Sequence, residues 1–118
     1  MKKILMFGFD VLPEILTVAG IAQKYGAEAV NVPKGSRHLT LAALERGETG
    51  SGGMAAAGGR MLVFCGLERE LDGLLAALRG AGIVCLKAVL TPANRDWTPG
   101  RLYRELERER RAMEGRGQ

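Results

Sequence analysis

The chain is poor in the residues that build metal sites and disulfides. Its 118 residues include only two cysteines and one histidine. Neither Cys65 nor Cys85 belongs to a C-x-x-C pair, so a structural zinc site lacks ligands. Both thiols are therefore expected to be reduced and buried in a cytoplasmic protein, and no metal site and no cofactor is predicted.

Long apolar runs are missing as well. No stretch of about 18 uninterrupted apolar residues occurs, which argues against a membrane span. The short run after Lys2 and Lys3 breaks at Gly8 and Asp10 without the cleavage site of a secretory signal.

Aromatic residues make up 5% of the chain and the net charge is only +4. Nucleic-acid binders usually concentrate basic residues and interleave aromatics, so nucleic acid is not expected as a partner.

What is present is the composition of a globular protein, with 47% apolar and 25% charged residues. This predicts one domain over residues 1–118. Continuous apolar runs predict strands, and an alternating run is typical of an edge strand. These strands are expected at 4–9, 29–32, 61–67 and 83–90.

Helical spacing of apolar residues fills the intervals between these strands. Helices are expected from Pro13 to Gly26, at 39–44 and at 71–78. A Gly- and Ala-rich stretch at 47–59 predicts a flexible loop. Thr98 and Pro99 are a good N-cap and first residue for a charged C-terminal helix over 98–114, where pairs such as Arg101–Glu105 and Glu107–Arg111 predict a solvated surface.

The two halves of the chain resemble each other at an offset of about 56 residues, each as a strand–helix–strand unit with a Gly-Ala turn. Whether they arose by duplication stays open. Apolar strands joined by helices predict an α/β fold with a mostly parallel four-stranded sheet in the order 2-1-3-4. The alternative is a ferredoxin-like α+β fold with its helices on one face.

The ends of the strands are one candidate site. Ligands of open parallel sheets bind where neighbouring connections diverge, here between Asp10 and Cys65. The dipole of the following helix would lower the pKa of the Cys65 thiol, and His38 would have to approach it in space to act as a base. A cap for the first helix is the preferred interpretation of Asp10.

The segment from Lys87 to Trp97 is the densest polar cluster. Lys87 interrupts a strand that should be buried, and a buried ammonium needs a partner or a route to solvent. In a structural interpretation, Thr91 and Asn94 satisfy the amides of a turn and Trp97 anchors the last helix. In a functional interpretation, Lys87, Thr91, Asn94 and Trp97 form a recognition surface.

The same segment carries a resemblance. Residues 87–97 read Lys-Ala-x-Leu-Thr-Pro-x-Asn-x-x-Trp, and the Leu102–Glu109 helix follows them. This part of the chain is similar to a bacterial family of small proteins known only as a domain of unknown function. The match runs from about Met61 to Arg110. The resemblance implies a small cytoplasmic bacterial domain and brings no activity, cofactor or partner.

Three classes of function follow from these observations, and the third and least favoured is a weak nucleic-acid binder that acts through the Arg-rich terminal helix. The first is a non-enzymatic binding or regulatory module that acts through the Lys87–Trp97 segment, as a homodimer or with another protein. The second is a small-ligand-binding protein or enzyme that uses Asp10, Cys65 and Thr91 at the strand ends. No catalytic residue is assigned, and the first class is favoured because no nucleophile with an evident base and no valid nucleotide motif occurs.

Overall fold

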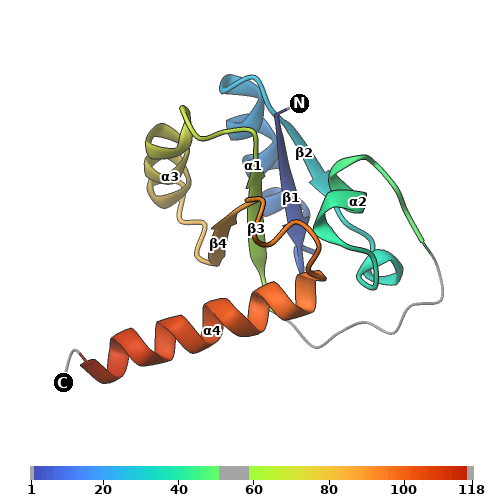
Figure 1. Ribbon diagram of the computed structural model, residues 1–118. Helices are drawn as coiled ribbons and strands as arrows, with labels where there is room; N and C mark the ends of the chain where they lie inside the picture. Colours follow the sequence, from blue (N-terminus) through green and yellow to red (C-terminus); the bar gives the residue numbers. More distant parts are fainter. Residues whose placement is uncertain (1, 51–58, 117–118) are drawn as a thin grey trace.

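Four strands form one sheet with helices on both of its faces (Figure 1). The computed structural model describes residues 2–50 and 59–116. Of the predicted loop at 47–59, residues 51–58 lie outside the described residues. In chain order the elements are β1 (Lys3–Phe7), α1 (Leu12–Lys24), β2 (Glu28–Asn31), η1 (Lys34–Ser36), α2 (Leu41–Glu45), β3 (Met61–Cys65), α3 (Leu71–Gly80), β4 (Leu86–Val89) and α4 (Pro99–Arg116).

The strand order is β2-β1-β3-β4, which confirms the predicted order. The outer ladders β1–β2 and β3–β4 are parallel, so the sheet is mostly parallel as expected. The central ladder between β1 and β3 is antiparallel, with Leu5 opposite Val63 and Lys3 opposite Cys65. The carboxyl ends of β1 and β3 therefore lie at opposite ends of the sheet.

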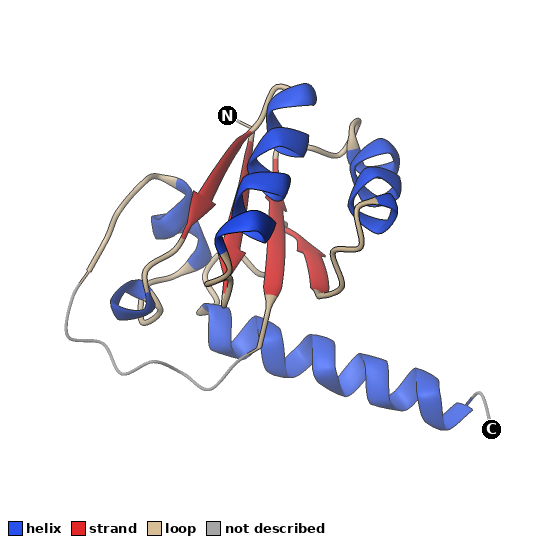
Figure 2. Ribbon diagram, turned by 180° about the vertical axis from the view of Figure 1, so that it is seen from behind, coloured by secondary structure: helices blue, strands red, loops and turns tan. Residues whose placement is uncertain are grey.

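Alternation along the two central strands sends side chains into two apolar cores. On one face, Ile4, Met6, Leu62 and Phe64 pack against α1 and α3. On the other face, neighbouring residues pack against α2 and the start of α4. Figure 2 shows α1 lying across the sheet on the first of these faces. Helices on both faces exclude the ferredoxin-like alternative. The second core contains Leu5, Phe7, Leu41, Leu44, Met61, Val63 and Leu102.

The last strand is shorter than predicted. The apolar run at 83–90 suggested a strand throughout, but β4 begins at Leu86. The reason is the end of α3, where Gly82 has a φ of 76° and the Ile83 N–H donates to the Leu78 carbonyl at 3.0 Å. Ile83 thus closes the preceding helix in a glycine C-cap motif. The next residue, Val84, is 80% exposed.

The expected N-cap of the first helix is wrong. The cap position is occupied by Val11 without a side-chain hydrogen bond, and Asp10 is exposed one residue earlier. A capping side chain accepts from the second or third helical N–H, and the second helical residue is Pro13, which has none. The Glu14 and Ile15 amides instead donate to the Val11 carbonyl, both at 3.1 Å.

The long C-terminal helix reaches beyond the body of the molecule. Its first turns pack on the sheet through Leu102, which is buried, with Tyr103 and Leu106 half-buried beside it. Its last turns project past β4 (Figure 1). Residues 108–114 are exposed, so this part of α4 presents nearly its whole surface to solvent.

Candidate functional site

Asn94 is the centre of a closed hydrogen-bonded turn. The Thr91 N–H donates to Asn94 Oδ1 at 2.9 Å, and the Asn94 N–H donates to Thr91 Oγ1 at 3.3 Å. Asn94 Nδ2 donates to the Val89 carbonyl at 3.0 Å. The Asn94 residue is only 9% exposed. Its amide therefore shapes the exit from β4, in agreement with the structural interpretation of the turn.

Lys87 lies on a sheet edge and on the face opposite to Trp97. It is aligned with Leu62 of the α1/α3 core and lines a shallow hollow with Leu75 and Arg79. Its Nζ donates to the Cys85 carbonyl at 3.2 Å. The expected surface that joins Lys87 to Trp97 is thus divided by the sheet, because Trp97 packs with the α2/α4 core.

Two outward-facing carbonyls of the β4 edge have partners from this chain. The Leu86 N–H donates to the Arg60 carbonyl just before β3, and the Leu90 N–H donates to the Phe64 carbonyl in β3, so the backbone groups of the alternate residues point away from the sheet. The Val89 carbonyl accepts from Asn94 and the Cys85 carbonyl from Lys87. A lysine and blocked carbonyls on an edge strand discourage pairing with a further strand.

Trp97 joins three elements. Its carbonyl accepts from the Leu41 N–H at 2.9 Å, and the Arg95 carbonyl accepts from the Ala42 N–H at 2.9 Å. The turn thereby satisfies amides at the start of α2 that have no partner inside that helix. The indole ring is half-buried in the α2/α4 core, and the Arg101 guanidinium lies 4.1 Å from its centroid. This is the geometry of a cation–π contact.

Thr98 caps α4 as predicted. Its Oγ1 accepts from the Arg101 N–H at 3.3 Å, and Pro99 follows as the first helical residue. The turn, the Trp97 ring and the cap together fix the start of α4 against the body of the protein.

Four arginines follow one side of α4, and we call them the arginine face. Arg101, Arg104, Arg108 and Arg111 are spaced by three, four and three residues, which places them on one side of a helix. The expected ion pair Arg101–Glu105 does not form, since Arg101 stacks on Trp97 and Glu105 lies 3.5 Å from Arg108.

The pair expected between Glu107 and Arg111 is present at 3.8 Å. The carboxylate of Glu107 also lies 3.1 Å from Arg110. The sequence marked this helix as Arg-rich, and we interpreted its charges mainly as pairs along a solvated surface, without noting that four arginines share one side. The spacing of the arginines in the sequence was the signal that could have revealed it.

Cys65 and Asp10 do not share a site. Cys65 is buried opposite Lys3 at the amino end of β1, whereas Asp10 follows the carboxyl end of β1. Burial raises the pKa of the Cys65 thiol to about 12, with a further contribution from the Glu45 carboxylate. The expected lowering by a helix dipole is wrong, because the side chain lies inside the α2/α4 core and α3 begins only at Leu71.

The strand-end cluster has no shared base either. Thr91 follows β4 and so lies at the same end of the sheet as Cys65. His38 is exposed and lies against Gly50 in the segment around α2. Among residues 2–50 and 59–116, no group of three or more His, Cys, Asp or Glu side chains could hold a metal ion.

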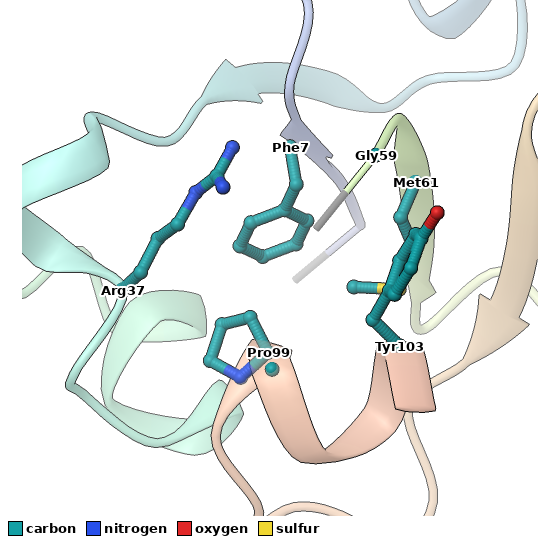
Figure 3. Close-up of a pocket in the computed structure, with 7 residues that line it drawn as sticks. Phe7, Arg37, Gly59, Met61, Pro99 and Tyr103 are labelled. Atoms are coloured by element: carbon teal, nitrogen blue, oxygen red, sulfur yellow. The ribbon is translucent and has the colours of Figure 1, made fainter. Parts of the chain in front are cut away.

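A small hollow lies where the start of α4 meets the ends of β1 and β3 (Figure 3). Its apolar wall includes Phe7, Met61 and Pro99, and its polar groups come from Arg37 and Tyr103. The cavity volume is only about 10 Å³. Sites for small organic ligands usually measure about 300–1,000 Å³. We therefore do not take this hollow as a ligand site.

These features define a three-layer α/β protein that carries the arginine face on its C-terminal helix. Residues 60–113 match the model of a protein family described as a domain of unknown function, DUF3783. The family resemblance of the second half is thereby confirmed. No curated protein and no solved structure matches the chain. In the described part of the chain, no helix is long and apolar enough to cross a membrane.

Proposed function

We propose that the chain is a non-enzymatic binding module that recognises an acidic surface of another protein in the cytoplasm. The binding surface consists of the exposed side of the Thr91–Trp97 turn and the arginine face of α4. The observation that carries this proposal is the stacking of Arg101 on Trp97, which joins the turn to the arginine face. The two free cysteines suit a reducing compartment.

The arginine face is accessible and partly preorganised. The side chains of Arg108 and Arg111 are 77% and 78% exposed. Among the described residues, Arg101 and Arg104 form no ion pair, so their N–H groups are available to a partner. Stacking holds Arg101 in place, which lowers the entropy that binding would cost. Guanidinium groups in a row suit carboxylates, which they bind through two parallel hydrogen bonds.

The flanking glutamates favour a protein partner over a nucleic acid. Glu105 and Glu107 lie beside the arginines and pair with Arg108 and Arg111. A phosphate backbone along the helix would meet these carboxylates and be repelled by them. An acidic protein surface that carries a few basic groups can instead match both signs of charge.

The positions of Asp10 and Cys65 do not support the second class of function. A strand-end enzyme would need Asp10 and Cys65 on one side of the sheet, and they lie at opposite ends. A thiol whose pKa is about 12 also has almost no thiolate at neutral pH. Asn94 and Thr91 use their polar groups inside the turn, which leaves the outer side of the turn for contact with a partner.

A direct binding experiment tests the proposal. We would titrate a labelled Glu-rich peptide with the protein and measure fluorescence anisotropy from about 20 to 200 mM salt. The charge-reversal variant Arg104→Glu/Arg108→Glu is expected to raise the dissociation constant at least about tenfold. The matched control is Arg69→Glu/Arg79→Glu, which changes the net charge by the same amount at one residue before α3 and one residue in α3. Its dissociation constant should stay within about twofold of the wild-type value.

Two outcomes would overturn the proposal. Equal loss of affinity in both double variants would show that binding follows net charge and not the arginine face. Tighter binding of a DNA or RNA duplex than of the acidic peptide, with affinity falling steeply with salt, would identify a nucleic-acid binder instead. Circular dichroism of each variant confirms that it is folded.

A further inference from the structure

Helix α1 exposes an apolar surface on the face of the sheet opposite to α4. Val11, Leu12 and Leu16 are 50%, 63% and 62% exposed. Leu12 and Leu16 are four residues apart and so share one side of the helix. The charged residues of α1 are Glu14 and Lys24, and the carboxylate of Glu14 pairs with Arg60 at 2.6 Å.

A glycine continues the row formed by Leu12 and Leu16. Gly20 lies in the interior of α1, where glycine is about 1 kcal/mol less favourable than alanine. A Cβ atom built at this position meets nothing within 4 Å, and its φ is not in the left-handed region. Within the described chain, no contact or backbone conformation requires glycine here. A glycine on an exposed helix side does allow another backbone to approach closely.

We propose that α1 packs antiparallel against α1 of a second copy of this chain. If the two-fold axis passes close to Leu16, Leu12 of each copy faces Gly20 of the other, and a large side chain enters the space above a glycine. The two Leu16 side chains meet at the axis.

The charges at the ends of α1 suit this arrangement. Asp10 precedes the helix and Lys24 ends it, and both are exposed. In an antiparallel pair about Leu16, Lys24 lies opposite position 8 of the other copy, two residues from Asp10. Asp10 lies in the non-helical segment just before α1, so this offset is at most about 7 Å, which the lysine and aspartate side chains together can bridge. Each end of the interface therefore brings one ammonium beside one carboxylate.

The dimer also has a consequence for the proposed binding module, although it does not depend on it. Because α1 and α4 lie on opposite faces of the sheet, pairing through α1 leaves both arginine faces free (Figures 1 and 2). The contact is a pair of 13-residue helices. Such an interface is smaller than the standard of about 1,600 Å², so a dissociation constant of about 1–100 μM is expected.

Analytical ultracentrifugation of the full chain from about 1 to 500 μM tests this inference. The wild type should pass from monomer to dimer over this range. Gly20→Leu should raise the dissociation constant at least about tenfold, because the new side chain occupies the space that receives Leu12. Gly80→Leu is the matched control, since Gly80 ends α3 with nothing within 4 Å of its own Cβ position, and its dimerisation should be unchanged.

Charge reversal gives an independent readout. Asp10→Lys and Lys24→Asp should each weaken the dimer, and the double variant Asp10→Lys/Lys24→Asp should restore it. A wild type that stays monomeric at about 500 μM would overturn the inference. So would a dimer that Gly20→Leu leaves intact, because it would have to use another surface. Since none of these variants touches the arginine face, their failure is distinguishable from failure of the proposed function.

Discussion

Replacing Asn94 by alanine should destabilise the fold by about 2 kcal/mol. The change removes two side-chain hydrogen bonds, from the Thr91 N–H at 2.9 Å and to the Val89 carbonyl at 3.0 Å. Each such bond contributes about 0.5–1.5 kcal/mol net. We expect a loss of free energy near the middle of the range for two bonds, because the Val89 carbonyl points to the sheet edge, where water can replace the Asn94 amide. For a chain of this length, the melting temperature should fall by about 8 °C.

Urea unfolding followed by circular dichroism measures this effect, with Thr91→Ala as the companion variant. Thr91→Ala removes only the acceptor of the Asn94 N–H and should cost about 1 kcal/mol. The double variant should cost less than the two single losses together, because both residues belong to one turn. If Asn94→Ala unfolds within about 0.5 kcal/mol of the wild type, the hydrogen-bond argument is wrong. If it also abolishes peptide binding while stability is kept, Asn94 contacts the partner.

Three further predictions concern single positions. Burial raises the pKa of Cys65 to about 12 against 9.0 for an ordinary thiol, so the unfolded chain loses this proton at lower pH than the folded chain. Urea unfolding should therefore show the free energy of unfolding falling as pH rises from about 9 towards 12, by at most about 1.4 kcal/mol per pH unit. Cys65→Ala should remove this part of the fall. Gly8→Ala should lower the free energy of unfolding by about 2–4 kcal/mol, because the φ of Gly8 is 76° and a Cβ atom there would lie 2.8 Å from the Gly59 carbonyl oxygen. Gly20→Ala should instead stabilise the monomer by about 1 kcal/mol at low protein concentration. Equal melting temperatures of the two variants would contradict this contrast. Thr98→Ala should cost about 1 kcal/mol of stability and Thr98→Ser much less, and an equal loss in both would show that the cap is not the cause.

Elements with strong local signals could be predicted from the sequence. Apolar runs marked the strands, and the Thr98–Pro99 pair marked the start of α4. The signal was weaker where one residue can serve two elements. Ile83 looks like the first residue of a strand, yet its N–H closes α3 after Gly82. Local composition does not distinguish these two uses of an apolar residue after a glycine.

The candidate site was predictable only in part. The hydrogen bonds of Thr91 and Asn94 lie within four residues of one another in the chain, so turn chemistry was enough to anticipate them. The separation of Lys87 from Trp97 depends on which face of the sheet each one occupies. The contact of the Trp97 carbonyl with α2 joins residues more than 50 positions apart, and no local pattern encodes it.

The predicted ligand site between Asp10 and Cys65 is wrong because of the way in which the two similar halves are arranged. In the central ladder, Leu5 lies opposite Val63 in the middle, Lys3 lies opposite Cys65 at one end, and Phe7 lies opposite Met61 at the other end. An axis between Leu5 and Val63 therefore relates each residue of β1 to the one 58 positions later in β3. That shift is close to the offset of the two similar halves, and Gly8 and Gly66, which come directly after the two strands, have φ values of 76° and 69°.

Two equivalent units related by a two-fold axis perpendicular to the sheet pair their first strands antiparallel, as β1 and β3 do here. Equivalent positions after the two strands then lie at opposite ends of the sheet. The antiparallel central ladder, and not the similarity of the halves alone, therefore separates Asp10 from Cys65. An approximate two-fold also places α1 and α3 as equivalent helices on one face. The halves differ beyond their second strands, where the later half adds the turn and the arginine face on which the proposed function rests.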